Sequence, residues 1–301
     1  MPDKPAAEIV IDEPLIRGLL REQAPGLARE PLRHVADGWD CSVWRVGERF
    51  AVRMPRRALG AQLVLHEQQH LGAISARLAP LRIPDPVVAG RPSAAYPWHW
   101  SIVPWADGTP GLSVARSDRG GWAVPLARAL RRLHVVAKGE FPVNPYRGVP
   151  LRERDAAIRA RLRQAEVFLG VGTARSLSAV WQAGVAAVAW TSGPVRIHGD
   201  LHPGNLIADG SALVSIIDFG DLTAGDPAYD LAVAWLAFDA RGRAAFQAEL
   251  QGVYDAPTWM RARAWAAAVA LMLVLQSDDD PDYRRLGREV VAELVPESSP
   301  H

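Results

Sequence analysis

Three polar side chains near the middle of the chain have the types and spacing needed for chemistry on a phosphate group. Asp200 and Asn205 lie in the segment 197–207, IHGDLHPGNLI, and Asp218 lies in the segment 214–220, VSIIDFG. Mg²⁺ prefers oxygen ligands and usually takes one or two protein carboxylates with phosphate oxygens and water. Asn205 and Asp218 suit that task, which leaves Asp200 free to orient an acceptor hydroxyl and take its proton. The set therefore predicts phosphoryl transfer.

Apolar residues of strand-forming type surround this polar set. Ile197 precedes the first motif, residues 206–207 follow it, and residues 214–217 lead into Asp218. We expect these runs to form short strands that fix the irregular loop between them at both ends. The polar side chains would then project from a rigid frame.

The N-terminal third has the pattern of a small antiparallel sheet with one helix. Residues 32–54 are rich in β-branched and aromatic types, and two turn-prone pairs, Asp37-Gly38 and Gly47-Glu48, divide them into three predicted strands. Apolar residues spaced by three and four predict a helix over 60–78. Prolines then leave two brief extended segments, at 87–89 and 100–103.

Beyond Pro104, Ala-rich and Arg-rich helical patterns dominate. Helices are expected over 124–136, 152–169, 174–190, 227–238, 257–275 and 283–294. One strand-type island, residues 195–218, interrupts them. A small mixed lobe, a short link at about 103–108 and a larger helical lobe therefore give an α+β fold class.

The motifs HGDLHPGN and IDFG resemble the catalytic-loop and metal-binding motifs of the protein-kinase-like fold. The glycine after His198, where protein kinases usually have arginine, points to the aminoglycoside phosphotransferase family. GWDCSVWRVG, AVRMPRR, the helix with Glu67, YPWHWSIVPWADG and GDPAYDLA also resemble that family. They occur in its order and cover most of residues 36–235.

This resemblance implies a bilobal, protein-kinase-like fold with a nucleotide-binding lobe at 1–104 and a catalytic, substrate-binding lobe at 105–301. It implies that Asp200 is the catalytic base and that Asn205 and Asp218 hold Mg²⁺. ATP or GTP would be the phosphate donor. The resemblance further implies that the Pro104 carbonyl and the Ala106 N–H contact the adenine. Finally, it implies that Asp226 and Asp230 brace the catalytic loop.

One departure from the kinase pattern concerns the cation of the third strand. The fold normally has lysine there, but the only lysines of this chain are Lys4 and Lys138, and Arg53 occupies the position. Arginine keeps the charge and can bridge phosphate oxygens with two donors. Glu67 lies on the apolar stripe of its helix, where an unpaired carboxylate is costly to bury. We therefore predict an Arg53–Glu67 ion pair in the nucleotide-binding part.

Other interpretations remain open. His66-Glu67-Gln68-Gln69-His70 matches the H-E-x-x-H pattern of zinc hydrolases, although a third ligand would be needed. The chain could also be a nucleotide-binding scaffold without activity, because Arg53 replaces the lysine. His202 could neutralise the transferred phosphate or make a structural hydrogen bond. Cys41 is expected to be a half-buried thiol.

The acceptor is predicted to be a small molecule. Five residues separate Gly220 from Asp226, too few for the activation loop of a protein kinase. Aspartates at 218–239 and 278–282 could bind a polycation, or could serve the metal and the fold. Five tryptophans could line a pocket for a bulky natural product, or could be core residues. An antibiotic hydroxyl, aminoglycoside-like first, is the leading candidate, with macrolides, nucleoside antibiotics and metabolic sugars or amino alcohols as alternatives.

Composition excludes several classes of protein. Among the 301 residues, 34 Lys and Arg balance 33 Asp and Glu, for a net charge of +1, which makes nucleic acid an unexpected partner. One cysteine excludes an internal disulfide and suits a reducing compartment. The N-terminus lacks the pattern of a secretory signal, and the apolar run 264–275 is shorter than a membrane-spanning helix. A cytoplasmic enzyme without membrane partners is expected, and its oligomeric state is left open.

Overall fold

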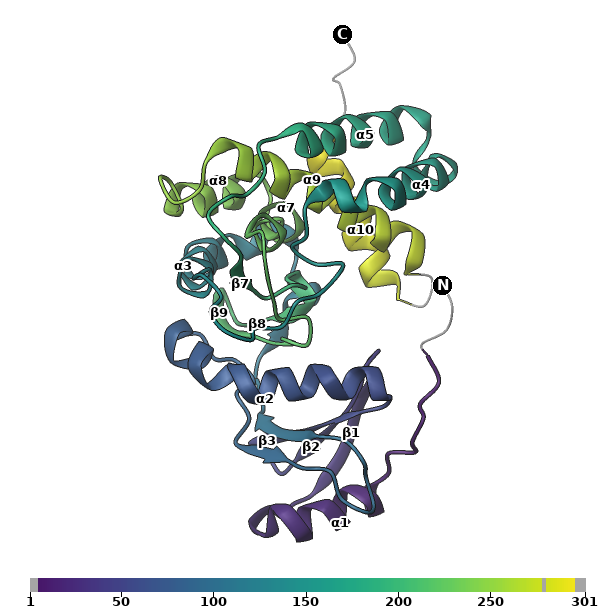
Figure 1. Ribbon diagram of the computed structural model, residues 1–301, viewed down its shortest axis with the longest axis vertical. Helices are drawn as coiled ribbons and strands as arrows, with labels where there is room; N and C mark the ends of the chain where they lie inside the picture. Colours follow the sequence, from purple (N-terminus) through teal and green to yellow (C-terminus); the bar gives the residue numbers. More distant parts are fainter. Residues whose placement is uncertain (1–4, 278–279, 296–301) are drawn as a thin grey trace. The chain divides into compact units, whose positions relative to one another are not determined.

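The computed structural model describes residues 5–277 and 280–295, which form two compact units (Figure 1). The N-terminal unit contains the described chain up to Asp107 together with Ile216–Gly220. The C-terminal unit begins at Gly108 and resumes at Asp221. The segment that carries Asp218 therefore groups with the N-terminal sheet, although it lies within the sequence range 105–301 assigned to the second lobe. The antiparallel sheet of one unit and the helices of the other confirm the predicted α+β class.

Five antiparallel strands form the sheet of the N-terminal unit, in the order β1-β2-β3-β5-β4. They are β1 (Leu32–Asp37), β2 (Cys41–Val46), β3 (Phe50–Pro55), β4 (Val88–Gly90) and β5 (Trp100–Pro104). The three strands predicted within 32–54 are confirmed, as are the two brief segments after them. Gly47 adopts a φ of 55° in the β2–β3 turn, a conformation that favours glycine.

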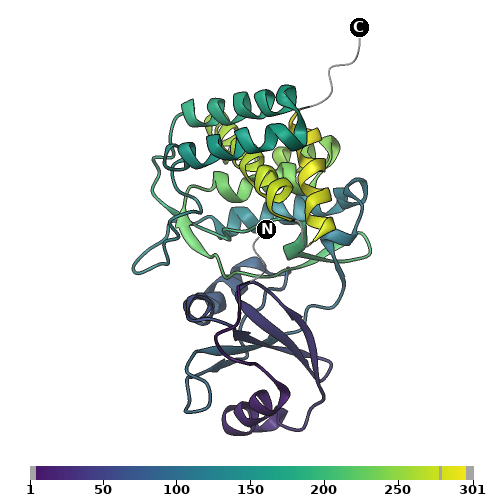
Figure 2. The ribbon, with the colours of Figure 1, turned by 90° about the vertical axis from the view of Figure 1, so that its right-hand side faces the viewer.

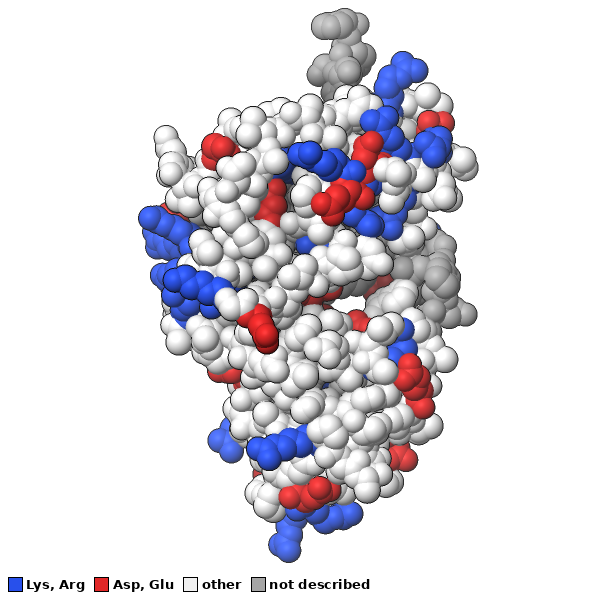
Figure 3. All heavy atoms as spheres, in the orientation of Figure 1, with Lys and Arg blue, Asp and Glu red and all other residues white. Residues whose placement is uncertain are grey.

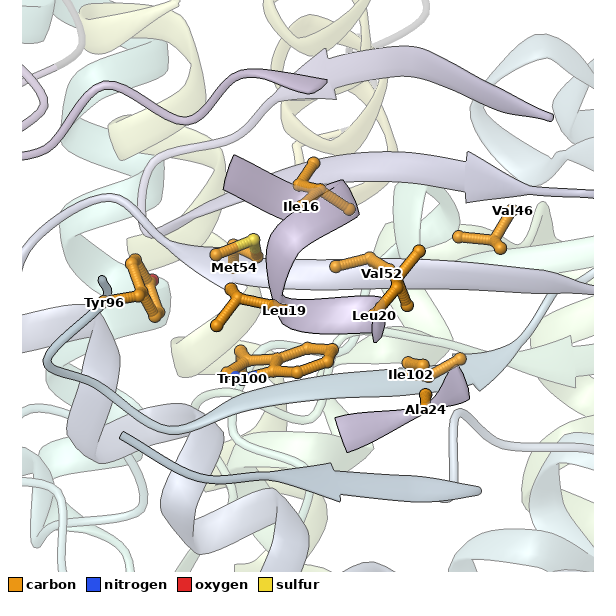
Figure 4. Packing of buried hydrophobic residues seen from close by; sticks show 10 residues of the cluster. All are labelled: Ile16, Leu19, Leu20, Ala24, Val46, Val52, Met54, Tyr96, Trp100 and Ile102. Atoms are coloured by element: carbon orange, nitrogen blue, oxygen red, sulfur yellow. The ribbon is translucent and has the colours of Figure 1, made fainter. Parts of the chain in front are cut away.

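Helix α1 (Glu13–Gln23) was not predicted, and it covers one face of this sheet. Figure 4 shows Ile16, Leu19 and Leu20 packed with strand residues such as Val52 and Trp100, and all of them are buried. Local signals for this helix were present in the sequence. The Asp12 carboxylate caps the first turn by accepting from Leu15 N at 2.9 Å, and the apolar residues have helical spacing.

The pleat of β3 separates its side chains between the two faces of the sheet. Val52 and Met54 belong to the core beneath α1, whereas Arg53 points to the other face. Helix α2 (Ala58–Leu78), predicted over 60–78, contacts β3 and β5 there. The pleat and this helix together place Arg53 beside Glu67.

The C-terminal unit is mainly helical. Its helices are α3 (Ala123–Leu133), α4 (Leu151–Leu169), α5 (Val171–Ala186), α6 (Ala228–Leu231), α7 (Val233–Ala237), α8 (Ala240–Glu249), α9 (Ala256–Gln276) and α10 (Pro281–Leu294). Helix α8 was not predicted, and the helix expected over 227–238 is two short helices. Figure 2 shows α4, α5 and α10 gathered around α9.

Helix α9 is long and apolar enough to cross a membrane by length and composition, but 67% of its apolar window is buried within the unit. A glycine on a neighbouring helix allows that helix to approach α9 closely. A Cβ at Gly184 of α5 would collide with the Cβ of Ala264 on α9. The contacts of α9 are therefore those of a core helix.

Two small sheets hold the loop 198–205. Strand β7 (Val195–Ile197) leads into it and pairs with β10 (Thr223–Gly225), while β8 (Leu206–Asp209) leaves it and lies between β6 (Thr109–Pro110) and β9 (Ala212–Ile216). The loop is fixed at both ends by strands, as predicted. On the face drawn in Figure 3, basic and acidic side chains are interspersed over α4 and α5, where Arg159 pairs with Asp155.

Candidate functional site

A buried carboxylate organises the loop that follows β7. Asp230 of α6 is fully buried and accepts hydrogen bonds from His198 N at 2.7 Å and Gly199 N at 3.0 Å. His134 Nε2 lies 3.0 Å from the same carboxylate. Burial raises the pKa of Asp230, but His134, His198 and the Gly199 N–H outweigh it and lower the pKa overall. Asp230 therefore braces the loop, as the sequence predicted.

Gly199 is required by the backbone of the loop. Its φ is 85°, and a Cβ would collide with the carbonyl oxygen of Asp221. This tight passage turns the chain so that Asp200 N donates to His198 Nδ1 at 3.1 Å. The glycine that distinguishes the motif from that of protein kinases therefore has a steric reason here.

The loop brings Asp200 and Asn205 together. Asn205 is 6% exposed, and its Nδ2 donates to the Asp200 carbonyl at 2.8 Å. Because the amide nitrogen is tied to the backbone, Oδ1 is the atom of Asn205 available as a ligand. The Asp200 side chain stays 30% exposed and can reach an acceptor.

His202 lies on one side of the Asp200 carboxylate. Its Nδ1 accepts from Gly204 N at 3.0 Å, which makes Nε2 the protonated nitrogen of the neutral ring. Nε2 lies 3.6 Å from Asp200 Oδ2. The structural hydrogen bond considered for His202 is therefore present, and its role toward the transferred phosphate stays a prediction.

Arg147 lies on the other side of Asp200, although no motif in the sequence indicated it. Its Nη2 lies 3.5 Å from Asp200 Oδ1 and 3.0 Å from Asp221 Oδ2. Burial raises the pKa of Asp200, but the charge of Arg147 and the contact with His202 lower it well below its ordinary value. Arg147 belongs to no periodic pattern or motif, so only its position in the fold identifies it.

In the N-terminal unit, Arg53 joins two carboxylates. Its Nη1 donates to Glu67 Oε1 at 2.6 Å, and its Nη2 donates to Asp218 Oδ1 at 3.1 Å. Glu67 is 1% exposed. Burial raises the pKa of Glu67, although Arg53 opposes this effect. The predicted Arg53–Glu67 pair is present, and Asp218 joins it.

Asp218 is held in an unusual conformation. Its φ of 60° is the only positive value found for a non-glycine among the described residues. Such strain is characteristic of functional sites. The Asp218 side chain is 56% exposed, and Arg53 engages Oδ1, so Oδ2 projects for another ligand.

Asn205 and Asp218 offer the hard oxygen atoms that Mg²⁺ prefers, so their chemistry fits the predicted ion. Asp200 and Asn205 belong to the C-terminal unit, whereas Asp218 belongs to the N-terminal unit. The meeting of all three at one metal–triphosphate centre stays a prediction.

The predicted hinge contacts lie at the end of β5. Trp105 N donates to Arg49 O at 2.8 Å, continuing the pairing of β5 with β3. Because the N–H and C=O of one peptide unit point in opposite directions, the Pro104 carbonyl points away from β3. That orientation suits contacts to a purine base, which also remain a prediction.

The helix with the H-E-x-x-H pattern does not resemble a zinc site. Glu67 is paired with Arg53, and His66 Nε2 lies 2.9 Å from Gln62 Nε2. Within residues 5–277 and 280–295, no group of three or more His, Cys, Asp or Glu side chains could hold a metal.

Cys41, expected to be half-buried, is instead buried, and burial raises the pKa of its thiol to about 12. It is therefore an unreactive thiol.

The suggested acidic rim is not an open surface. Five aspartates of 218–239 each have a partner: Asp218 with Arg53, Asp221 with Arg147, Asp226 with Arg261, Asp230 with His134 and Asp239 with Gly242 N. Asp280 caps α10 and Asp282 pairs with Arg285. Asp278 and Asp279 lie outside the described residues.

The tryptophans of the C-terminal unit are largely core residues. Trp181 packs edge-on against Trp265, and Trp235 packs against Trp259. Trp190 differs, because it lines a cavity of about 400 Å³ between the start of α4 and the end of α5. Four of the five tryptophans thus contribute to aromatic packing rather than to a broad pocket wall.

The fold is that of known antibiotic kinases. The GDP complex of aminoglycoside 2'-phosphotransferase-IIIa superposes with a TM-score of 0.70 at 19% identity, covering 94% of this chain and 98% of that chain. The GDP and kanamycin complex of APH(2")-IIIa superposes with a TM-score of 0.67 at 19% identity, covering 93% of this chain and 97% of that chain. Macrolide 2'-phosphotransferase MphH from Brachybacterium faecium superposes with a TM-score of 0.57 at 19% identity, covering 95% of this chain and 98% of that chain.

No curated protein sequence matches the chain at a significant level. The model of the phosphotransferase enzyme family, abbreviated APH, matches residues 31–265, which include the nucleotide-site candidates, the loop 198–205 and Asp218. The chain therefore belongs to the phosphotransferase enzyme family and is a small-molecule kinase that transfers phosphate to an alcohol group.

Proposed function

We propose that this enzyme uses ATP or GTP with Mg²⁺ to phosphorylate a hydroxyl group of an antibiotic or a similar natural product. The observation that carries the proposal is the loop 198–205. It presents the half-open carboxylate of Asp200 beside an Asn205 amide whose nitrogen is already bound. A base and a metal ligand side by side are what phosphoryl transfer to a hydroxyl requires.

Asp200 is the proposed base. Its carboxylate accepts a hydrogen bond from the acceptor hydroxyl, orients the oxygen toward the γ-phosphorus and takes the proton as the new O–P bond forms and the bond to the leaving nucleoside diphosphate breaks. Its lowered pKa keeps it ionised at neutral pH, as a group that takes up a proton must be. His202 Nε2, which lies 3.6 Å from Asp200 Oδ2, would donate to an oxygen of the transferred group.

Asn205 and Asp218 would hold Mg²⁺, which offsets negative charge on the β- and γ-phosphates. Arg53 offers a guanidinium fork for the phosphates while Glu67 keeps it in place. The Pro104 carbonyl and the Ala106 N–H would contact the purine. GDP and ADP complexes of structurally similar proteins support a nucleotide donor in this fold.

The acceptor class is a hydroxylated antibiotic. Complexes with kanamycin, gentamicin and streptomycin are known for proteins of this fold, and so are macrolide 2'-phosphotransferases. The aspartates once considered for a polycation site are committed to arginine, histidine or backbone partners. An aminoglycoside-like acceptor and a macrolide therefore both stay candidates. A single buried cysteine is consistent with action in the cytoplasm.

A donor-consumption screen tests the proposal. The enzyme is incubated with Mg²⁺ and ATP or GTP against a panel of macrolides, aminoglycosides, nucleoside antibiotics, sugars and amino alcohols, with Asp200→Ala as the blank. We expect acceptor-dependent release of ADP or GDP by the wild type and none by the variant. Bound nucleotide with no turnover across the panel would instead identify a silent scaffold.

A further inference from the structure

Arg147 is the centre of a charge network beside Asp200. Its Nη1 donates to the Tyr229 hydroxyl at 2.6 Å, and its Nη2 contacts Asp221 and Asp200 at 3.0 and 3.5 Å. Asp221 Oδ1 in turn accepts from Asn144 Nδ2 at 2.8 Å. Burial lowers the pKa of Arg147, but Tyr229, Asp200 and Asp221 raise it well above its ordinary value. Its guanidinium is thus a fixed positive charge with three partners.

The backbone on both sides of Arg147 is anchored. Before it, Asn144 N donates to Thr223 Oγ1 at 2.8 Å, and after it, Asp226 N donates to the Gly148 carbonyl at 2.8 Å. Gly148 has a φ of 63°, and its Cα lies against Gly225 of β10. A side chain attached to so constrained a segment has little freedom to move.

The two oxygens of the Asp200 carboxylate therefore have different neighbours. Arg147 lies by Oδ1, and His202 lies by Oδ2. The contact of 3.5 Å to Oδ1 is an electrostatic one, and the shorter contacts to Asp221 and Tyr229 fix the guanidinium itself. The Arg147 guanidinium on one side and the His202 imidazole on the other define the plane of the carboxylate without enclosing it.

We propose that Arg147 is a positioning residue for Asp200, held by Asp221 and Tyr229 so that the carboxylate presents one orientation to the acceptor hydroxyl. This inference rests on the proposed role of Asp200 as base. Misplacing a reacting group by about 1 Å can cost about 10²-fold in rate. Loss of Arg147 should therefore lower kcat far more than it changes nucleotide binding.

Kinetics of Arg147→Ala and Arg147→Lys test the proposal, with Arg154→Ala as the matched control. Arg154 lies on α4. Its guanidinium stacks over the ring of Tyr146, the residue before Arg147, at 4.9 Å. We expect Arg147→Ala to lower kcat by about 10- to 100-fold with the KM for ATP within about twofold of the wild type. Arg147→Lys should recover part of the loss, and added guanidinium should raise kcat of Arg147→Ala but not of Arg154→Ala.

A crystal structure of each Arg147 variant gives a second measurement that needs no acceptor. We expect the Asp200 carboxylate to adopt a new or a mixed orientation in Arg147→Ala, with the loop 198–205 unchanged. An unchanged Asp200 side chain, or a kcat of Arg147→Ala within twofold of the wild type, would overturn the proposal. If Asp200→Ala turns over normally, the proposed base is wrong, and the crystal structure still decides whether Arg147 orients the carboxylate.

Discussion

At the scale of single residues, the site depends on carboxylates that are buried with their partners. Glu67 and Asp230 are nearly or fully inaccessible, and each is bound to a cationic or hydrogen-bonding group from elsewhere in the chain. Removing one member of such a pair lowers the free energy of unfolding more than removing both, because the remaining charge stays buried without compensation. Two predictions follow from this asymmetry.

Arg53→Met should destabilise the protein by about 3–5 kcal/mol, because Glu67 is left buried without a cation. Arg53→Met combined with Glu67→Leu should recover most of that stability but none of the phosphotransferase activity, since the proposed phosphate contact is still missing. Chemical denaturation and initial rates measure the two effects. Arg159→Met is the control, because Arg159 is half exposed and pairs with Asp155 one turn away on α4, so its loss should cost less than about 1 kcal/mol.

Asp230→Asn should destabilise the protein by about 2–3 kcal/mol at pH 7, because charge-assisted hydrogen bonds to the loop are weakened. The folded-state pKa of Asp230 is lower than that in the unfolded chain, about 3.9, so its ionised form stabilises the fold above that value. The difference between wild type and variant should be constant near neutrality and shrink as the pH falls below about 4.

Denaturant titrations at pH 7, 5 and 3.5 measure that trend. Asp209→Asn changes an exposed carboxylate at the end of β8 and should alter stability by less than about 0.5 kcal/mol. A stability difference for Asp230→Asn that grows on acidification would contradict the assigned direction of the pKa shift.

At the scale of elements, the helical unit is organised by close approach to α9. Gly184 on α5 lies against Ala264 with no space for a Cβ, and Gly287 on α10 packs closely on Leu273 and Val274. Small residues let the helix backbones come near enough for their neighbours to interdigitate. The predicted helices 174–190 and 257–275 were found as α5 and α9 because their apolar spacing is strong, but the sequence did not show that they meet at Gly184.

Gly184→Ala should destabilise the protein by about 1–3 kcal/mol, because the added methyl group forces α5 and α9 apart. Combining it with Ala264→Gly should recover part of the loss. Gly172→Ala is the control in the same helix, because a Cβ there meets nothing within 4 Å. That variant should gain a few tenths to about 1 kcal/mol from helix propensity. Thermal unfolding of the four proteins measures both effects, and equal melting temperatures for the two single variants would refute the packing argument.

At the scale of the whole molecule, the proposed nucleotide site joins residues that are distant in the sequence. Asp218 comes late in the chain but groups with β3 and α2 through Arg53. The N-terminal unit therefore includes a proposed metal ligand of its own. Binding of a Mg-nucleotide should stabilise the native state by about 2.7 kcal/mol at 100 times its Kd.

This stabilisation should require Asp218 but not Asp200. We expect ATP or GTP with Mg²⁺ to raise the melting temperature of the wild type and of Asp200→Asn by several degrees. EDTA should abolish the rise. Asp218→Asn should lose most of it, because asparagine tolerates the positive φ but lacks the carboxylate charge. Equal shifts in all three proteins would show that Asp218 does not hold the metal.

The strands of the N-terminal sheet and most helices could be predicted from the sequence, because those features depend on turn chemistry and apolar periodicity over short spans. It also predicted the Arg53–Glu67 pair, since a carboxylate on a buried helix stripe requires a cation. Helix α1 was equally local, with its Asp12 cap and apolar spacing, and was missed.

Which distant charges meet could be seen only in the folded chain. It placed Arg147 beside Asp200, grouped Ile216–Gly220 with the N-terminal unit and paired the aspartates that had suggested an acidic rim. Arg147 and Asp200, like Asp226 and Arg261, are separated by dozens of residues, and all of these except Arg261 belong to irregular segments. Packing of the surrounding elements brings them together, and no local spacing in the chain records that packing.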